Sequence, residues 1–270
     1  MSPLAGAARR LAAVSDTPLL DAELLLAHAL GIDREQLALN PPDEIPHAFE
    51  DLIARREGGE PVAYIVGRRA FWTIELEVAP GVLVPRPDSE TLMDAAVAHF
   101  DGSAGPRRML DLGTGSGALL LAALDQWRRS TGIGVDRSPA ALAIAQRNAT
   151  RLGMADRAEF RLGDWADGID ERFDLILCNP PYVAVSGDLG PGVAEHEPNE
   201  ALFAGEDGLD ASRLRAPQFP RLLGEGGLAA VEIGFDQAAS AASLLARDGL
   251  SARLARDLAG RPRALLLTWV

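Results

Sequence analysis

The strongest constraint on the fold is a regular exchange of strand and helix patterns that begins at Arg107. Short apolar runs are typical of buried strands, and longer amphipathic segments are typical of helices. We predict strands at Met109–Leu112, Gly132–Val135, Glu159–Leu162, Phe173–Cys178 and Gly227–Ile233, helices at Ala118–Trp127, Pro139–Leu152 and Ala239–Arg247, and a closing pair of strands at Leu250–Leu254 and Ala264–Trp269. This alternation predicts a doubly wound α/β domain, in which helices cover both faces of one sheet.

The first 70 residues have a helical pattern with no strand pattern between the helices. A leucine-rich face runs from Leu19 to Leu30 and meets a helix stop at Gly31. Strand-forming residues then extend from Phe71 to Val84, with a Pro-Gly turn between them. We therefore predict a small helical domain at 1–70, a β-hairpin linker at 71–87 and the α/β domain at 88–270.

The sequence Asn179-Pro180-Pro181-Tyr182 follows the predicted strand Phe173–Cys178. Two prolines end a strand because each lacks an amide N–H and fixes φ. They leave an Asn amide, stiff carbonyls and an aromatic ring at the carboxyl edge of the sheet, where ligands bind in open α/β folds. The Asn179 oxygen and the Pro180 carbonyl are two acceptors suited to an NH2 group on a planar carbon, and Tyr182 would pack against that plane. We predict alkylation of such a nitrogen, with Asn179, Pro180 and Tyr182 as catalytic residues and Asn179 through Tyr182 as the substrate-binding residues.

A glycine-rich loop, Asp111 through Gly117, joins the first strand of the α/β domain to its helix. Its glycines permit positive φ and a close approach of a ligand to the backbone. The spacing Gly113-x-Gly115-x-x-Ala118 also fits a dinucleotide-binding loop, and Asp136 would serve a ribose in either case. The loop therefore predicts nucleotide-type binding without selecting the cofactor.

Two features favour S-adenosylmethionine over a dinucleotide. The carboxylate of Asp111 would repel a pyrophosphate, whereas S-adenosylmethionine has no phosphate and carries an amino group and a sulfonium. After the third strand, Asp164 and Trp165 offer a carboxylate and an indole to the adenine. The predicted cofactor-binding residues are Asp111, Gly113, Thr114, Gly115, Ser116, Gly117, Asp136, Asp164, Trp165 and Asn179.

Bulk properties disfavour several other classes of function. A net charge of −13 argues against sequence-independent binding of nucleic-acid phosphates, so we expect no direct DNA binding. No stretch approaches the roughly 20 apolar residues of a membrane span. A single cysteine and four scattered histidines offer neither a disulfide framework nor metal-ligand spacing. We expect a cytoplasmic protein that has no metal and no membrane partner.

Motifs along nearly the whole chain carry a resemblance to one family. Besides Asp111–Gly117 and Asn179–Tyr182, they are Asp21-Ala22-Glu23-Leu24-Leu25, Glu60-Pro61-Val62-Ala63-Tyr64-Ile65, Phe71, Val84-Pro85-Arg86-Pro87, Glu197-Pro198, Ala201-Leu202, Asp207-Gly208-Leu209 and Asp257-Leu258-Ala259-Gly260-Arg261. This set resembles the HemK/PrmC-type methyltransferases. The family usually has Glu-Thr-Glu after Pro-Arg-Pro, whereas this chain has Asp88-Ser89-Glu90. The change keeps a carboxylate and a hydroxyl but shortens the reach of the acid at position 88.

The resemblance implies a Rossmann-like, class I S-adenosylmethionine-dependent methyltransferase. Such an enzyme would methylate the N5 nitrogen of the glutamine in the Gly-Gly-Gln motif of class I peptide chain release factors. It implies that the loop glycines line the cofactor, that Asp136 holds the ribose hydroxyls, that Trp165 contacts the adenine, and that Asn179 through Tyr182 receive the glutamine. The helical domain would dock the release factor, and we expect a monomer.

Three other enzymatic hypotheses remain. The first is glutamine methylation of a ribosomal protein, which differs only in the partner chosen by the helical domain. The second is a DNA or RNA amino-methyltransferase, which predicts a basic groove and a target-recognition segment, and the acidic total counts against it. The third is a dinucleotide-dependent oxidoreductase, which leaves Asn179 through Tyr182 unexplained. A non-catalytic cofactor-binding protein is a fourth hypothesis, and the intact acceptor motif argues against it.

Overall fold

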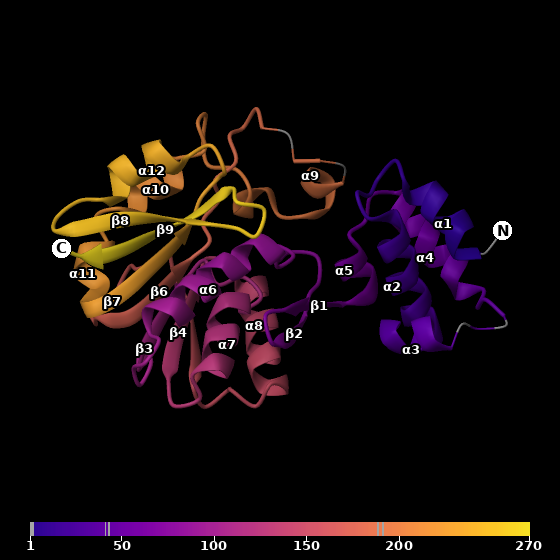
Figure 1. Cartoon of the computed structure of the whole chain (residues 1–270), viewed down its shortest axis with the longest axis horizontal. Coiled ribbons are helices and arrows are strands. Elements are labelled where there is room, and N and C mark those ends of the chain that lie inside the picture. The colour runs from indigo at the N-terminus through magenta and orange to yellow at the C-terminus, as the bar shows by residue number, and fades with distance from the viewer. Residues whose placement is uncertain (1–2, 41, 43, 188, 191) are drawn as a thin grey trace. The chain divides into compact units, whose positions relative to one another are not determined.

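A computed structural model of the chain describes residues 3–40, 42, 44–187, 189–190 and 192–270. The chain divides into two compact units. Unit 1 comprises Met1–Arg68, Val78–Pro80 and Asp188–Glu197, and unit 2 comprises Arg69–Glu77, Gly81–Gly187 and Pro198–Val270. Figure 1 labels their helices and strands. Within the described part of the chain, none of the helices is both long enough and apolar enough to span a bilayer.

Unit 1 is helical, as its sequence pattern predicts. Its helices are α1 (Pro3–Leu11), α2 (Pro18–Leu30), α3 (Arg34–Leu39), α4 (Ala48–Glu57), α5 (Val62–Val66) and α9 (Val193–His196). The apolar faces of α1, α2 and α4 share a core that includes Leu11, Leu25 and Phe49. The predicted helix stop at Gly31 is confirmed, because this residue has φ 68° and its N–H bonds the carbonyls of Ala27 and His28.

A segment from far along the chain also belongs to unit 1. The His196 Nε2 atom of α9 lies 3.3 Å from the carbonyl oxygen of Gly58, at the end of α4. Gly192 packs so closely on Gly59 that a Cβ on Gly192 would overlap the Gly59 carbonyl. The helical unit is therefore completed by residues 189–190 and 192–197, which no local pattern in the sequence connects with it.

The β-hairpin lies earlier than predicted. Its strands are β1 (Arg68–Phe71) and β2 (Ile74–Glu77), and residues 82–84 form no strand. The turn is at Trp72, whose φ is 53°, and the Trp72 N–H donates to the Glu90 carboxylate at 2.9 Å. The turn predicted at Pro80-Gly81 was wrong. The turn instead interrupts the alternating apolar residues that begin at Phe71, and no glycine marks its position.

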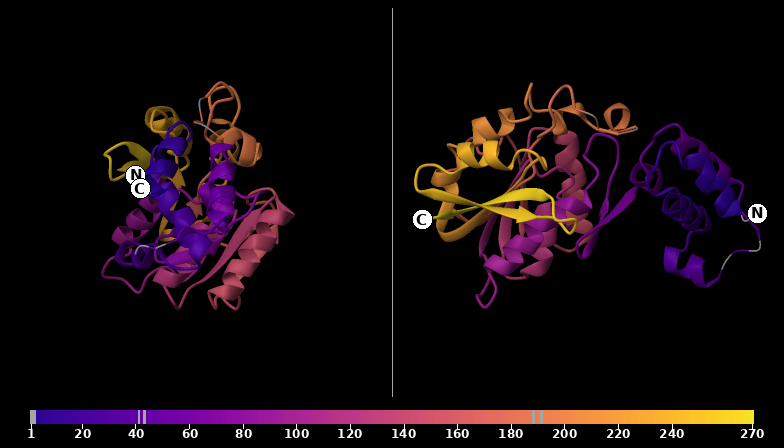
Figure 2. Two further views of the ribbon diagram at one scale, coloured as in Figure 1. Left: turned by 90° about the vertical axis from the view of Figure 1, so that its right-hand side faces the viewer. Right: turned by 45° about the horizontal axis from the view of Figure 1, so that its top comes forward.

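Unit 2 contains a seven-stranded sheet whose order is β5-β4-β3-β6-β7-β9-β8. The strands are β3 (Arg108–Leu112), β4 (Thr131–Asp136), β5 (Ala158–Leu162), β6 (Phe173–Cys178), β7 (Leu223–Glu232), β8 (Leu250–Arg256) and β9 (Pro262–Trp269). The first five strands in this order are parallel, and β9 runs antiparallel to both of its neighbours. Figure 2 (right) shows the β8–β9 pair in yellow. Every strand predicted between Met109 and Trp269 is confirmed.

Helices cover both faces of this sheet, which confirms the doubly wound fold. One face carries α6 (Glu90–His99), α7 (Ala118–Gln126) and α8 (Pro139–Arg151), and the other carries α10 (Asp210–Arg215), α11 (Phe219–Leu222) and α12 (Ala238–Leu245). Two short 3-10 segments, η1 (Pro87–Ser89) and η2 (Asn199–Ala201), lie in connecting loops. Successive residues of β6 alternate between the two cores, with Leu175 and Leu177 in one and Ile176 and Cys178 in the other.

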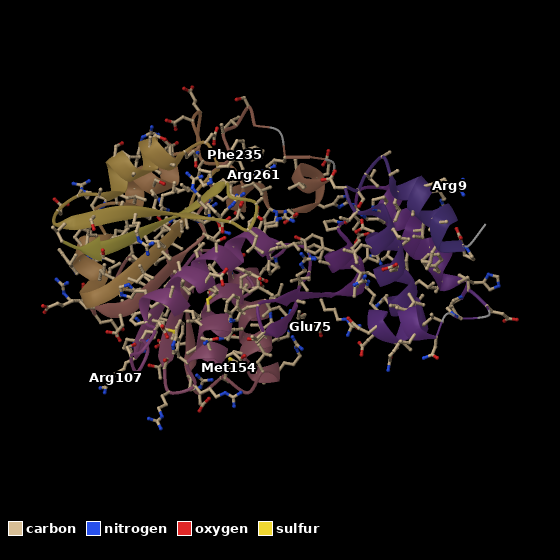
Figure 3. The ribbon with its side chains drawn as sticks, viewed as in Figure 1. Arg9, Glu75, Arg107, Met154, Phe235 and Arg261 are labelled. Carbon is tan, nitrogen blue, oxygen red and sulfur yellow. The ribbon has the colours of Figure 1, made fainter. Side chains whose placement is uncertain are left out.

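The strand order reverses beside β3, which is where an open α/β sheet places its ligand crevice. From β3 the chain crosses to β4 and β5 on one side, and later returns to β6 and β7 on the other. Arg107 precedes β3 and Phe235 follows β7, and Figure 3 shows these two residues at opposite ends of the sheet. The loops that follow β3 and β6 meet at the Phe235 end.

Candidate functional site

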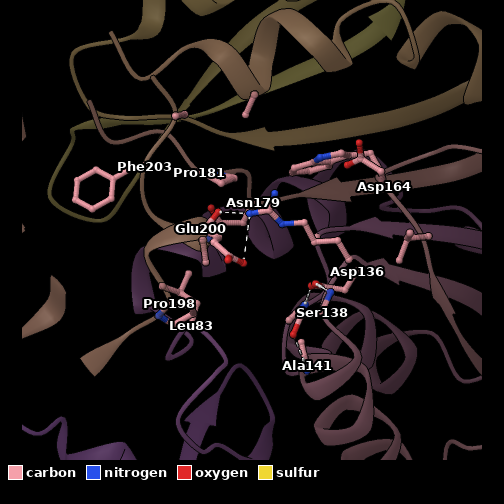
Figure 4. A pocket seen from close by; sticks show the side chains of 18 of the residues that line it. Leu83, Asp136, Ser138, Ala141, Asp164, Asn179, Pro181, Pro198, Glu200 and Phe203 are labelled. Atoms are coloured by element: carbon pink, nitrogen blue, oxygen red, sulfur yellow. Dashed lines mark hydrogen bonds and ion pairs between the residues drawn. The ribbon is translucent and has the colours of Figure 1, made fainter. Parts of the chain in front are cut away.

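A cavity of about 330 Å³ lies at the carboxyl ends of β3, β4, β5 and β6, within unit 2. Its wall includes seven of the predicted site residues, namely Gly113, Gly115, Asp136, Asp164, Trp165, Asn179 and Pro181. Figure 4 shows side chains from these separate strand ends directed around one space. The volume is within the usual range of small-molecule sites, about 300–1,000 Å³. The cavity brings the predicted cofactor loop and the predicted acceptor motif together.

The glycine loop is held in a tight left-handed turn. Gly113, Gly115 and Gly117 have φ values of 73°, 55° and 84°. The Gly115 N–H donates to Asp136 Oδ2 at 2.9 Å, and the Ser138 N–H donates to Asp136 Oδ1 at 2.9 Å. A carboxylate oxygen accepts more than one hydrogen bond. Asp136 can therefore fix the loop and still offer acceptors to hydroxyl groups in the cavity.

Four of the predicted cofactor-binding residues in this loop are buried, namely Asp111, Thr114, Ser116 and Gly117. Asp111 Oδ2 accepts the Thr114 hydroxyl at 2.7 Å and the Leu120 N–H at 3.3 Å. Burial raises the pKa of the Asp111 carboxyl to about 7. Asp111 and Thr114 therefore brace the loop from within, and the loop backbone at Gly113 and Gly115 forms part of the cavity wall.

Trp165 stands in the cavity wall with a cation on one face of its ring. The Arg215 guanidinium carbon is 3.6 Å from the centroid of that ring, and one guanidinium nitrogen lies 3.9 Å from Asp164 Oδ1. Burial lowers the pKa of Arg215 to about 10. Trp165 has φ 58°, which is unusual for a non-glycine residue. This backbone strain is maintained where the indole and the Asp164 carboxylate border the cavity.

The acceptor motif divides between the cavity and the core behind it. Asn179 and Pro181 line the cavity, and Pro180 is buried. The Asn179 amide nitrogen donates to Ser89 Oγ at 3.1 Å. The Tyr182 hydroxyl donates to Glu232 Oε1 at 3.1 Å. The phenol group of Tyr182 is therefore engaged by the protein itself.

The structure adds residues that the sequence analysis did not select. The Arg263 guanidinium bonds Asp88 at 2.9 Å and Asp257 at 3.2 Å, so the shorter acid at position 88 does reach a partner. The predicted site residues also did not include Glu232, which ends β7, or Ser89 and Arg215. One signal for Glu232 was available, because a carboxylate that ends a buried strand points to the same edge as the acceptor motif.

Two charged side chains face each other at the rim of the cavity. An Arg137 guanidinium nitrogen lies 3.5 Å from Glu200 Oε2, and both side chains are largely exposed. Exposed ion pairs of this kind contribute about 0–1 kcal/mol. This pair therefore borders the opening without fixing it.

Comparison with known proteins agrees with the geometry. The family model for the PrmC N-terminal domain matches residues 4–67, and a methyltransferase-domain model matches residues 106–232. The release factor glutamine methyltransferase of Rhodospirillum rubrum is 44% identical over 269 residues, which cover 97% of this chain and 82% of that protein. The chain belongs to the release factor glutamine methyltransferase family. The family member from Caulobacter vibrioides is 40% identical, with 93% of this chain and 89% of that protein covered.

A solved structure supports the fold assignment. A methyltransferase from Pyrococcus furiosus superposes with a TM-score of 0.55 at 18% identity, over 82% of this chain and 96% of that one. The class I methyltransferase fold expected from the resemblance is thereby confirmed.

The family is S-adenosylmethionine-dependent, and the residues present fit this cofactor. The cavity offers a glycine backbone without Cβ atoms, the carboxylate of Asp136 and the indole of Trp165. These groups suit an adenosine with two free hydroxyls. A chain of phosphates would instead call for cationic or amide donors at the loop.

Proposed function

We propose that this enzyme methylates the N5 nitrogen of the glutamine in the Gly-Gly-Gln motif of class I peptide chain release factors. The observation that carries the proposal is the place of Asn179, which lines the cofactor cavity and has its amide nitrogen bound to Ser89. The relatives match nearly the whole chain at 40–44% identity and are named release factor glutamine methyltransferases, and these names support the choice of substrate. We propose that the reaction takes place in the cytoplasm.

The cavity residues would bind the methyl donor in an extended form. Backbone groups of Gly113 and Gly115 would contact its methionine part, and Asp136 would accept the two ribose hydroxyls. Trp165 would contact the adenine ring, and Asp164 would accept its amino group. S-Adenosylmethionine, when bound, supplies a methyl group made electrophilic by the adjacent sulfonium. The loop support provided by Asp111 keeps these contacts in place.

The chemical task of the protein is to place a weak nucleophile. A glutamine amide nitrogen is a poor nucleophile because its lone pair is delocalised into the carbonyl. We propose that Asn179 Oδ1 and the Pro180 carbonyl accept the two N–H bonds of the glutamine amide. These acceptors orient the nitrogen and favour the positive charge that develops on it. Each effect contributes several kcal/mol, so no strongly basic side chain is needed. The N5 nitrogen would lose its proton to solvent after it has taken the methyl group from the sulfonium.

Other residues would shape the substrate site. Pro181 lines the cavity beside Asn179, and the ring of Tyr182 would support the plane of the glutamine amide. The helices of residues 1–70 would dock the body of the release factor, and we propose that one copy of the chain is sufficient. These roles follow from the family resemblance together with the positions of the motif residues.

The test incubates the purified enzyme with labelled S-adenosylmethionine and a release factor. We expect label on the intact factor and none on a factor whose motif glutamine is replaced. Label on both factors, or on neither, would reject the proposal. A ribosomal protein and an adenine-containing DNA duplex serve as competing substrates, and preferential labelling of either one would support the corresponding alternative.

Asn179→Ala tests the proposed acceptor. We expect cofactor affinity to change less than about threefold while turnover falls about 10²- to 10³-fold, as for loss of one preorganised hydrogen-bonding group. Gln146→Ala is the matched control, because it removes an exposed side-chain amide from α8 outside the cavity wall. Near-normal turnover in Asn179→Ala would disprove the acceptor role.

A further inference from the structure

Arg215 is a buried cation in the cavity wall whose N–H groups are poorly paired. The residue is 7% exposed and lines the cavity. One guanidinium nitrogen donates to the Ala211 carbonyl at 3.4 Å, and another lies 3.9 Å from Asp164 Oδ1. In the part of the chain that the structure describes, the buried Nε atom has no hydrogen-bond partner. Burial of a cation is costly unless its donors are paired, so this side chain calls for a further acceptor.

Arg215 reaches the cavity because one face of α10 forms part of the wall. Ala211, Leu214 and Arg215 are spaced as i, i+3 and i+4, which places them on the same side of the helix. All three line the cavity. Leu214 is 66% exposed, so an apolar side chain is open at this wall. This face of α10 therefore offers an apolar surface next to a cation, a combination that suits a heteroaromatic base.

The Trp165 indole sets the plane of the guanidinium. The guanidinium carbon lies 3.6 Å from the ring centroid. At this distance the group stacks flat on the ring, because an N–H pointing into the ring would hold the carbon farther away. The N–H groups lie in the guanidinium plane, so stacking attracts the charge but supplies no acceptor for the donors. The donors are left to bind at the edge of the stacked pair.

Arg215 and Asp164 together present a hydrogen-bond donor beside an acceptor. A guanidinium only donates, and a carboxylate only accepts. Their separation of 3.9 Å exceeds the usual N–H···O range of about 2.7–3.2 Å. Each group therefore keeps the capacity to bind a third group. Burial lowers the pKa of Arg215 to about 10, so the donor is still a cation at neutral pH.

Adenine carries the complementary pair of groups. Its amino group donates, and a ring nitrogen, N1 or N7, accepts on either side of the carbon that bears it. An Asn or Gln side chain recognises adenine through the same combination of one acceptor and one donor. A purine with an oxygen at this carbon would instead place an acceptor against the Asp164 carboxylate. The pair of side chains therefore fits adenine and disfavours an oxopurine.

We propose that Arg215 is a further cofactor-binding residue, which donates a hydrogen bond to the adenine ring nitrogen beside the amino group that Asp164 accepts. The inference rests on the proposed function, because it assumes that the adenine of S-adenosylmethionine lies at Asp164 and Trp165. It supplies the acceptor that the buried guanidinium calls for. It also gives Leu214 a role as an apolar contact for the base.

The test measures binding by calorimetry and needs no release factor. The ligands are S-adenosylhomocysteine, which is the demethylated cofactor, and two analogues in which C–H replaces either N1 or N7. In the wild type, one of the two analogues should bind about 10- to 150-fold more weakly than S-adenosylhomocysteine, as for loss of a hydrogen bond to a charged group. Arg215→Met keeps the stem without the N–H groups. In this variant S-adenosylhomocysteine should itself bind about 10- to 150-fold more weakly, and the penalty for that analogue should fall below about twofold.

Arg213→Met is the matched control, because Arg213 is on the same helix, is outside the cavity wall and pairs with Asp207 and Asp210. It should bind all three ligands as the wild type does. Equal binding of all three ligands by the wild type would overturn the proposal. A uniform loss of affinity for the three ligands in Arg215→Met would also overturn it, since that result is expected if the arginine only supports the Trp165 indole.

Arg215→Gln provides a second variant if Arg215→Met does not fold. Its neutral amide is a weaker donor than a guanidinium, so the penalty for the affected analogue should fall at least threefold. An unchanged penalty would reject the role of Arg215.

S-Inosylhomocysteine, in which oxygen replaces the amino group, separates this inference from the proposed function. It should bind the wild type at least tenfold more weakly than S-adenosylhomocysteine, and Asp164→Asn, whose amide can donate to that oxygen, should narrow the difference. If Asp164→Asn leaves the difference unchanged, the proposed placement of the amino group fails, and the two ring-nitrogen analogues still decide the role of Arg215. If the release factor is not methylated, the proposed substrate fails and these binding results stand.

Discussion

Gly208 lies directly behind the carbonyl group of Tyr182, and a Cβ atom on Gly208 would overlap that oxygen. The Gln237 side-chain nitrogen donates to the Tyr182 carbonyl at 2.9 Å and to the Gly208 carbonyl at 3.2 Å. Gly208 also has φ 73°, which a residue with a side chain rarely adopts. This close approach fixes where the turn that starts at Asn179 ends.

Gly208→Ala should therefore displace the acceptor motif. We expect turnover to fall at least tenfold, because misplacement of about 1 Å near the reacting atoms is enough for a large loss. The affinity for S-adenosylmethionine, measured by calorimetry, should stay within about threefold, because the cofactor loop is on another strand. Gly153→Ala is the control, since Gly153 has φ 68° and open space around its Cα atom. Both variants should lose about 1–2 kcal/mol of stability from the left-handed backbone. Gly208→Ala should lose more, because its Cβ atom overlaps the Tyr182 carbonyl. Equal turnover in the two variants would contradict this prediction.

Trp165→Leu should weaken cofactor binding. The indole borders the cavity and is held by the Arg215 guanidinium at 3.6 Å. Loss of an aromatic partner for a base costs about 1–3 kcal/mol, so the Kd for S-adenosylmethionine should rise about 5- to 150-fold. Trp269→Leu is the matched control. Trp269 lies on β9, outside the cavity wall, and its indole also has an arginine beside it, with the Arg172 guanidinium carbon 6.0 Å from the ring centroid. An unchanged Kd in Trp165→Leu would show that the Trp165 indole does not contribute to cofactor binding.

Asp111 should make the protein less stable as the pH rises. Its pKa is raised from an ordinary value of 3.8 to about 7, so between these values the unfolded chain has lost a proton that the folded chain keeps. The free energy of unfolding then decreases with pH across this window, by at most about 1.4 kcal/mol per pH unit, and levels off above pH 7. Denaturant unfolding from pH 4 to 8 should show a shallower decrease in Asp111→Asn. An identical slope in the variant would contradict the prediction.

The helical unit should depend on one buried ion pair. Arg56 Nε lies 2.8 Å from Asp21 Oδ2, with side chains 12% and 11% exposed, and Arg56 also donates to the Val14 carbonyl. Arg56→Met leaves the Asp21 charge without its partner and should lower stability by about 3–5 kcal/mol.

The control for this pair is Arg34→Met, which breaks the more exposed pair with Glu23 and should cost about 0–1 kcal/mol. Thermal unfolding of the two variants, followed by calorimetry, provides the comparison. Equal losses would mean that burial does not distinguish the pairs.

Sequence patterns predicted the strands of the α/β unit closely, and Phe173–Cys178 has the predicted bounds. Buried parallel strands are recognisable because both of their faces are covered, which requires a continuous apolar run. The hairpin was placed incorrectly, since the turn at Trp72 depends on packing against Glu90 and carries no glycine signal. Residues 189–190 and 192–197 were not predicted to join the helical unit, because a long-range contact leaves no local periodicity in the sequence.

The sequence by itself determined the order of strands and helices, the glycine loop, the acceptor motif and the family. Each of these depends on neighbouring residues, whose spacing reflects backbone geometry directly. Only the tertiary structure decided that Asp111 supports the loop, that Arg215 packs on Trp165, and that the Asn179 amide is bonded to Ser89. Those relationships arise where separate strands end at one edge of the sheet, and burial there determines which groups pair and which carboxyls retain their protons.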